Sequence, residues 1–159
     1  MATNNNNYKE YTVKVYKDRT EWYLKGKLHR EDGPAIEYAD GTKYWYLDGK
    51  YHCEDGPAIE YADGYKEWWL NGNRHREDGP AVEWADSSKA WFLNGKLHHE
   101  DGPAVEYANG SKYWYLNGIQ YSEAGWKKKI AKIKNKNSCN GRIVEIDGKK
   151  YKLIEENNT

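Results

Sequence analysis

The 159-residue chain has few of the residues that usually build a core or perform catalysis, with one Phe, one Met and two cysteines. Its apolar runs are far shorter than the ~18 residues of a membrane span, and residues 1–7 lack the hydrophobic stretch of a secretion signal. Cys53 and Cys139 lie far apart without the paired spacing of a zinc site, so we expect free thiols. These absences favour a soluble protein of the reducing cytoplasm.

What the chain has instead is aromatic residues, eight Trp and fifteen Tyr. Flat rings must therefore supply most of the buried apolar area, which suits a β-sheet. The net charge of zero is unevenly distributed. Residues 22–120 carry 17 acidic and 11 basic residues, whereas residues 121–142 carry one acidic and seven basic residues. A mildly acidic region thus precedes a short basic one.

The same sequence motif recurs every 23 residues, which is a period typical of a stack of small repeated units. One tryptophan recurs at this interval: Trp22, Trp45, Trp68, Trp91 and Trp114. A Glu-Asp-Gly-Pro-Ala block recurs with it, and its aspartates are Asp32, Asp55, Asp78 and Asp101. Because Pro has no N–H, this block is expected to be a bend that joins one unit to the next.

Each unit contains two turn signals, such as Asp40-Gly41 and Asp48-Gly49. Two-residue Asp-Gly or Asn-Gly loops favour type I′ hairpins, so the sequence predicts two strands per unit and a fixed register. In this register Ile36 faces Trp45 across the first turn, and Trp45 faces His52 across the second. The first predicted face collects the residues that vary least between units: Ile36, Tyr38, Trp45, Leu47 and His52. The second collects the more variable residues: Ala35, Glu37, Tyr44, Tyr46 and Tyr51.

These units resemble MORN repeats, in the segments Asn94-Gly95-Lys96-Leu97-His98 and Tyr107-Ala108-Asn109-Gly110-Ser111-Lys112-Tyr113. The chain departs from that family in its Glu-Asp-Gly-Pro-Ala block and in having Trp where a Tyr-x-Gly phrase is usual. The resemblance covers about residues 20–121 and implies an all-β repeat fold, an elongated and twisted antiparallel β-meander. It also implies protein contacts, and it supplies no catalytic residues. Repeats with this sequence look most like the MORN-type repeats of proteins from bacteria, bacteriophages and large DNA viruses.

Four segments follow from these patterns. Residues 1–21 form a tail and a capping strand, and residues 22–121 form the repeats. Residues 122–136 hold a basic amphipathic helix, predicted over 123–135 because Trp126, Ile130 and Ile133 recur at helical spacing. Residues 137–159 hold a final hairpin, with strands at 142–146 and 149–154, and a tail. Because an array end exposes its last face, we expect the helix and hairpin to cap it.

Candidate chemistry is sparse. Each repeat histidine stands three residues before an aspartate, as His52 does before Asp55, which suggests a metal site. Successive histidines are two strands apart, however, about 9–10 Å, which is too far to share an ion. Neighbouring strand residues point to opposite faces, so His52 cannot activate Cys53. We therefore expect no enzyme, no metal and no cofactor.

The function expected from the sequence is binding of a protein partner through an extended aromatic and acidic sheet face. Its aromatic residues are Tyr23, Tyr46, Trp69, Phe92 and Tyr115, and its acidic residues are Glu37, Glu60, Glu83 and Glu106. Rings beside carboxylates are good anchors for a basic surface. The resemblance of these repeats to those of phage and viral proteins suggests a phage-encoded inhibitor of a host enzyme or defence complex, acting in the host cytoplasm.

Three alternatives stay open. Aromatic side chains could hold a small nucleotide or signalling ligand. The basic patch of the helix could contact nucleic acid, although the acidic repeats would repel its phosphates. It could also contact an anionic membrane, although the apolar face of the helix is short. That patch consists of Lys127, Lys128, Lys129, Lys132 and Lys134. An exposed sheet edge or array end could also pair two copies into a homodimer.

Overall fold

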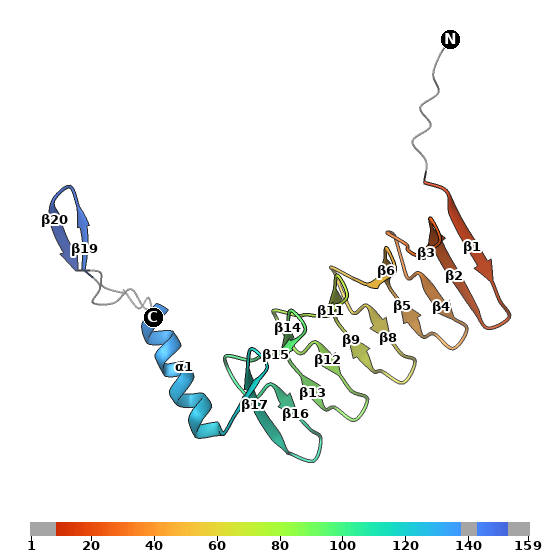
Figure 1. Cartoon of the computed structure of the whole chain (residues 1–159). Coiled ribbons are helices and arrows are strands. Elements are labelled where there is room, and N and C mark those ends of the chain that lie inside the picture. Colours follow the sequence, from red (N-terminus) through yellow and green to blue (C-terminus); the bar gives the residue numbers. More distant parts are fainter. Residues whose placement is uncertain (1–8, 138–142, 153–159) are drawn as a thin grey trace, which may run out of the picture. The chain divides into compact units, whose positions relative to one another are not determined.

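The computed structural model describes residues 9–137 and 143–152 (Figure 1). Within it the chain divides into two compact units between Ser122 and Glu123. Among the described residues, no helix combines the length and the apolar character that crossing a membrane would require. The expected final strands, at 142–146 and 149–154, reach beyond the described ranges at residue 142 and at residues 153–154. Cys139 also lies outside these ranges.

The first unit is a long antiparallel meander that does not close on itself, with 12 strands among the described residues. Two strands open it, β1 (Tyr11–Val15) and β2 (Arg19–Leu24). Four hairpins follow at the 23-residue interval: β4 (Ile36–Tyr38) with β5 (Lys43–Tyr44), β8 (Ile59–Glu60) with β9 (Lys66–Glu67), β12 (Val82–Glu83) with β13 (Lys89–Ala90), and β16 (Val105–Glu106) with β17 (Lys112–Leu116). The expected all-β meander of repeated hairpins is confirmed.

A second row of short hairpins runs along one side of this sheet (Figure 1). Its members are β2 with β3 (Lys27–Leu28), β6 (Tyr46–Leu47) with β7 (Lys50–Tyr51), β10 (Trp69–Leu70) with β11 (Asn73–Arg74), β14 (Phe92–Leu93) with β15 (Lys96–Leu97), and β17 with β18 (Ile119–Tyr121). In the middle units the chain turns from one row into the other at the repeated tryptophan. There Trp45 N–H donates to the carbonyl of Ala58 in the next unit, at 2.8 Å.

The register predicted across the second turn of each unit is confirmed, since Tyr46 pairs with Tyr51. Asp48 and Gly49 both have positive φ, 51° and 79°, as a two-residue type I′ loop requires. The register predicted across the first turn is wrong by one residue, because Ile36 pairs with Tyr44 rather than with Trp45.

A three-residue loop causes this shift. Tyr38 N–H donates to the carbonyl of Thr42 at 2.9 Å and Gly41 N–H donates to that of Tyr38, so Ala39, Asp40 and Gly41 form the loop. The Asp40 carboxylate accepts the Thr42 N–H at 2.8 Å, and Gly41 has φ 93°. This is a type I turn followed by a left-handed glycine. A slip of one residue exchanges the faces of a strand, so the predicted division into two faces fails.

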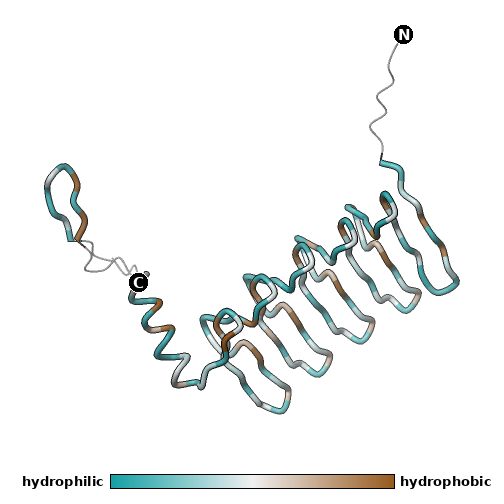
Figure 2. The backbone as a smooth tube through the Cα atoms, in the orientation of Figure 1, coloured by the Kyte–Doolittle hydropathy of each residue, from teal (hydrophilic) through white to brown (hydrophobic). Residues whose placement is uncertain are grey.

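The sheet has one buried row and one charged row. The buried row runs across the strands in register: Glu21, Ile36, Tyr44, Ile59, Glu67, Val82, Ala90, Val105 and Tyr113. Its last member, Tyr113, is exposed. The charged row alternates Glu and Lys: Glu37, Lys43, Glu60, Lys66, Glu83, Lys89, Glu106 and Lys112. In Figure 2 the hydrophobic residues lie along the strands and the hydrophilic ones at the turns.

The core is thin and periodic. Ala35, Ala58, Ala81 and Ala104 are fully buried where the joint of each unit meets the sheet. Val82, Ala90 and Val105 form a cluster on which half-buried rings and Leu97 pack. Because the aliphatic side chains are small, neighbouring strands can carry large rings without a collision.

The second unit contains the helix α1 (Glu123–Asn137) and a hairpin of β19 (Ile143–Ile146) and β20 (Lys149–Lys152). The predicted helix is confirmed and ends two residues later than expected. The predicted pairing of Val144 with Tyr151 is also confirmed. Trp126 and Ile130 are buried, which agrees with an apolar stripe along the helix. Whether this segment caps the array stays a prediction.

Candidate functional site

Three equivalent clefts recur along the first unit, each between the Glu-Asp-Gly segments of two successive repeats. They have volumes of about 500, 460 and 390 Å³. Each contains a tryptophan, a leucine and a histidine of the later repeat, here Trp45, Trp68 or Trp91 with its neighbours. Four carboxylates stand around each cleft against one arginine, Arg30 or Arg76. Each cleft is therefore acidic, with an apolar floor.

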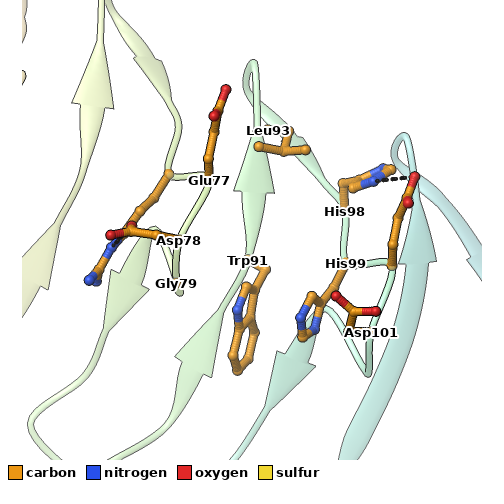
Figure 3. A pocket seen from close by; sticks show the side chains of 10 residues that line it. Glu77, Asp78, Gly79, Trp91, Leu93, His98, His99 and Asp101 are labelled. Carbon is orange, nitrogen blue, oxygen red and sulfur yellow. Dashed lines mark hydrogen bonds and ion pairs between the residues drawn. The ribbon is translucent and has the colours of Figure 1, made fainter. Parts of the chain in front are cut away.

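Figure 3 shows the cleft in which Trp91 and Leu93 lie between Glu77 and Asp78 on one side and Asp101 on the other. The carboxylates of these joints are strongly exposed. Glu77 and Asp78 are 84% and 85% accessible, so solvent screens them while they are unbound. Exposed carboxylates grouped in this way attract a cation from solution.

In three units, the residue after the repeat histidine lies against the tryptophan of its own unit. Arg30 and Arg76 lie over Trp22 and Trp68 with the guanidinium carbon 4.2 and 4.0 Å from the ring centre. His99 stacks on Trp91 at 4.6 Å with an interplanar angle of 5°. One side of each of these tryptophans is thus covered from within the unit.

The same residues hold the joint in its bent shape. Arg76 Nε donates to the carboxylate of Asp78 at 2.9 Å, and Arg76 Nη1 donates to the carbonyl of Pro80 at 3.2 Å. In the next unit, His99 Nδ1 lies 2.9 Å from the carbonyl of Pro103, in the place of the contact between Arg76 and Pro80. The hydrogen bond from Arg76 lowers the pKa of Asp78. Asp78 therefore stays charged well into acid solution.

The repeat histidines connect successive short hairpins. In each case Nδ1 accepts the backbone N–H of a turn residue 19 positions further on, which is Asp48 for His29 and Asn71 for His52, at 3.1 and 3.2 Å. Nε2 faces a carboxylate of the same unit, 3.6 Å from Glu54 in the case of His52. These histidines therefore join the units through Nδ1, while Nε2 lies near a carboxylate without a hydrogen bond in the case of His29. Among residues 9–137 and 143–152, no three His, Cys, Asp or Glu side chains are grouped as metal ligands.

Cys53 occupies the position that Arg30, Arg76 and His99 occupy in their units, and it is half-buried. Burial raises the pKa of the Cys53 thiol above its ordinary value. A thiol with a raised pKa is a poor nucleophile at neutral pH. The neighbouring His52 points its Nδ1 to the backbone N–H of Asn71 instead.

The aromatic residues predicted to bind a partner are all half-buried and face the core side of the sheet. Tyr23 donates to Glu21 at 2.7 Å, a bond that raises the pKa of Tyr23 to about 12. Phe92 and Tyr115 pack against the cluster of Val82, Ala90 and Val105, and Tyr46 lies against Tyr51 with ring centres 4.3 Å apart and the rings tilted by 31°. Trp69 Nε1 donates to Glu67 at 2.6 Å. Each ring has a structural contact, so truncating it would also disturb the fold.

The predicted acidic partners lie in the charged row, on the other face of the sheet from the row that these rings cover. They pair with lysines of their own hairpins, 3.9 Å for Glu37 with Lys43 and 3.0 Å for Glu60 with Lys66. Glu106 lies 3.6 Å from Lys112, and Glu83 accepts from Arg76 at 3.1 Å. The expectation that rings and these carboxylates share one face is therefore wrong. The one-residue change of register separates them.

The basic patch lies on α1, and all five of its lysines are exposed. Lys127 pairs with Glu123 one turn earlier, at 2.6 Å. The other side chains of the patch project from the helix that carries Trp126 and Ile130 on its buried stripe. A cationic helix surface is present, as predicted.

Sequence reasoning identified the Glu-Asp-Gly-Pro block as a joint but not as the wall of a cleft. One sequence feature could have indicated the clefts. The residue after the repeat histidine differs between units, as Arg30, Cys53, Arg76 and His99, whereas its neighbours stay constant. Comparison of the chain with models of known families and with curated proteins finds no match.

Proposed function

We propose that this chain is a non-catalytic repeat protein that binds a protein partner, and that the partner contributes an extended basic segment to the row of clefts. The observation that supports this most is the repetition itself, three acidic clefts with an apolar floor in one line. A lysine or arginine side chain brings both parts that such a cleft accepts, an apolar stem and a cationic end.

The spacing narrows the kind of segment. Equivalent points of successive units are two strands apart, about 9–10 Å at ~4.8 Å per strand. An extended segment in the polyproline II conformation has three residues per turn and advances ~3.1 Å per residue, so every third side chain of the partner would point to the next cleft. The partner segment should therefore carry Lys or Arg at positions i, i+3 and i+6.

Other partners fit these clefts less well. Nucleic acid would bring phosphates toward four carboxylates per cleft, which opposes binding. The exposed lysines of α1 are a separate surface, and contact with nucleic acid or an anionic membrane through them stays the second proposal. The resemblance to MORN repeats supports protein contact, and a phage-encoded inhibitor that covers a basic surface of a host protein would have this design.

The test is fluorescence anisotropy with labelled ten-residue peptides. A peptide with Lys at every third position should bind more tightly than a peptide of the same composition in which the lysines alternate with neutral residues. Because rim charges contribute about 0.2–1 kcal/mol each, the double variant Glu54→Gln/Asp55→Asn should bind about three- to tenfold more weakly at low salt.

The matched control neutralises two carboxylates of the charged row, Glu37→Gln and Glu60→Gln, which leaves the clefts unchanged. Equal loss in the control and in the cleft variant would indicate only general attraction to an acidic protein. Equal binding of the two peptides would contradict the spacing. Loss on charge reversal at Lys127, Lys128 and Lys129 would favour the helix surface instead.

A further inference from the structure

A different recess, of about 510 Å³, lies beside the first turn of the second repeat hairpin and is lined mainly by aromatic rings. The rings are Tyr61, Tyr65 and Trp84, with Ile59 and Ala85 beside them. The carboxylates of Asp63, Glu67 and Asp86 complete its lining. It shares no lining residue with the three acidic clefts.

Two departures from the repeat create this recess. At the position of Tyr65 the other units have Thr42, Ser88 and Ser111, which carry no ring. At the position of Trp84 they have a tyrosine, namely Tyr38, Tyr61 and Tyr107. Tyr61, Tyr65 and Trp84 therefore meet at this joint. At the preceding joint Tyr44 takes the middle place between Tyr38 and Tyr61.

The rings form walls of different orientation. Tyr61 and Tyr65 meet at 5.4 Å between ring centres with an interplanar angle of 70°, and Tyr65 meets Trp84 at 6.4 Å and 63°. Tyr65 is fixed from below, because its hydroxyl donates to the carboxylate of Glu67. Its orientation does not depend on a ligand, so the surface is formed before binding.

The surroundings select the charge of a ligand. Asp63 and Asp86 are exposed at the rim and accept N–H groups of their own turns, from Tyr65 and Ser88 at 2.9 Å. Glu67 is paired with Arg74 and is 6% accessible. The open side of the recess therefore carries negative charge and aromatic faces, which repel a phosphate and attract a cation. A nucleotide, one of the ligands that rings could hold, fits this site poorly.

We propose that this recess binds a methylated ammonium group, the cation that rings and carboxylates recognise together. The group is compact and apolar on its surface, so it gains from ring contact where a hydrated ammonium does not. Two sources carry it, a free small molecule of the choline type and a methylated lysine of a protein chain. The proposal does not rest on the function assigned to the acidic clefts.

The experiment is isothermal titration calorimetry of the full chain with choline and with its uncharged isostere, 3,3-dimethylbutan-1-ol. Choline should bind at least about tenfold more tightly, because only the cation gains from the ring quadrupoles. A short peptide with trimethyllysine, and the same peptide with unmodified lysine, distinguish a protein source from a free one. Tighter binding of the trimethyllysine peptide than of choline would assign the site to a modified chain.

The variant Tyr65→Ser replaces the added ring by the residue that the next units have, and it should weaken choline binding about fivefold or more. Tyr107→Ser removes an exposed ring outside the recess and should leave binding unchanged. If Tyr65→Ser fails to fold, Trp84→Tyr, which restores the residue of the repeat, should weaken binding by a smaller factor. Equal binding of choline and its isostere, or unchanged binding in both recess variants, would overturn the proposal.

Discussion

At the scale of single residues, Glu67 brings a buried carboxylate into a row that is otherwise apolar apart from Glu21 at its start. It is 6% accessible and accepts from Arg74 at 2.9 and 3.0 Å, from Trp69 at 2.6 Å and from the Tyr65 hydroxyl. Four donors satisfy an anion that would otherwise be costly to bury. Ala90 occupies the equivalent position one unit later and needs no partner, so this network is particular to its unit.

Acid should weaken the fold through Glu67. Burial by itself would raise the pKa of Glu67, but the hydrogen bonds from Arg74 and its neighbours outweigh burial and hold the pKa below its ordinary value of 4.5. A lowered pKa in the folded state means that the contribution is complete above pH 4.5 and is lost as the pH falls toward the folded pKa. Urea unfolding between pH 7 and pH 3 should therefore show Glu67→Gln destabilised at pH 7, with the difference from the parent shrinking in acid.

The loss at pH 7 should be about 2–3 kcal/mol, below the full cost of breaking a buried pair because Arg74 is 37% accessible. Glu37→Gln is the matched control, since that carboxylate is half-exposed and pairs loosely with Lys43. A parent-minus-variant difference that stays constant down to pH 3 would rule out Glu67 as the titrating group.

At the scale of elements, two kinds of Asp-Gly or Asn-Gly turn alternate along the chain. The second turn of each unit has two residues, both with positive φ, as in Asn71 with 51° and Gly72 with 83°. The first has three residues, and its aspartate caps the N–H two positions on, as Asp63 does for Tyr65. Ser87, with φ 72°, takes the left-handed position where the other units have glycine.

A methyl group at Gly72 should cost stability through its backbone alone. An added Cβ would meet Lys50 at 3.6 Å, which is ordinary contact, so the loss comes from the positive φ. Gly72→Ala should destabilise by about 1–2 kcal/mol, measured as a lower urea midpoint. Gly56→Ala is the control, because no atom lies within 4 Å of its added Cβ and its φ is not positive. Equal losses in the two variants would show that the left-handed turn is not the cause.

At the scale of the whole molecule, the described part of the first unit is built by near-neighbour contact. Each hairpin pairs with the next, and the histidine, alanine and tryptophan contacts join adjacent units. Stability in such a stack is close to a sum of unit terms and interface terms. The three clefts have the same origin, because each needs only two successive units.

Removal of one complete period should therefore leave a shorter folded array. Deleting residues 36–58 joins Ala35 to Ile59 in phase, so Ile59 takes the place of Ile36 beside Glu21. The variant should keep a cooperative urea transition with a smaller m-value, because less surface is exposed on unfolding. Deleting residues 36–55 is out of phase and should abolish the transition. A folded out-of-phase variant would contradict the repeat register.

The amino-acid sequence by itself determined the period, the presence of two turns per unit, and the helix with its apolar stripe. These follow from local chemistry, since Asp-Gly turns, helical spacing and a 23-residue interval act over short distances. The tertiary structure decided the faces. Asp40-Gly41 and Asp48-Gly49 are the same dipeptide, yet one closes a three-residue loop and the other a two-residue loop.

That choice depends on what the flanking strands bury. With the longer loop, Ile36 and Tyr44 fall in one row and Glu37 and Lys43 in the other, so that the apolar side chains of this hairpin are separated from its charges. The same shift moved the predicted acidic residues away from the predicted rings, and it brought the carboxylates of adjacent joints together around a tryptophan. The clefts could not be predicted from one unit because they form between two units. The loop length could not be predicted because the free energy gained by burying one row of side chains outweighs the local preference of a single turn.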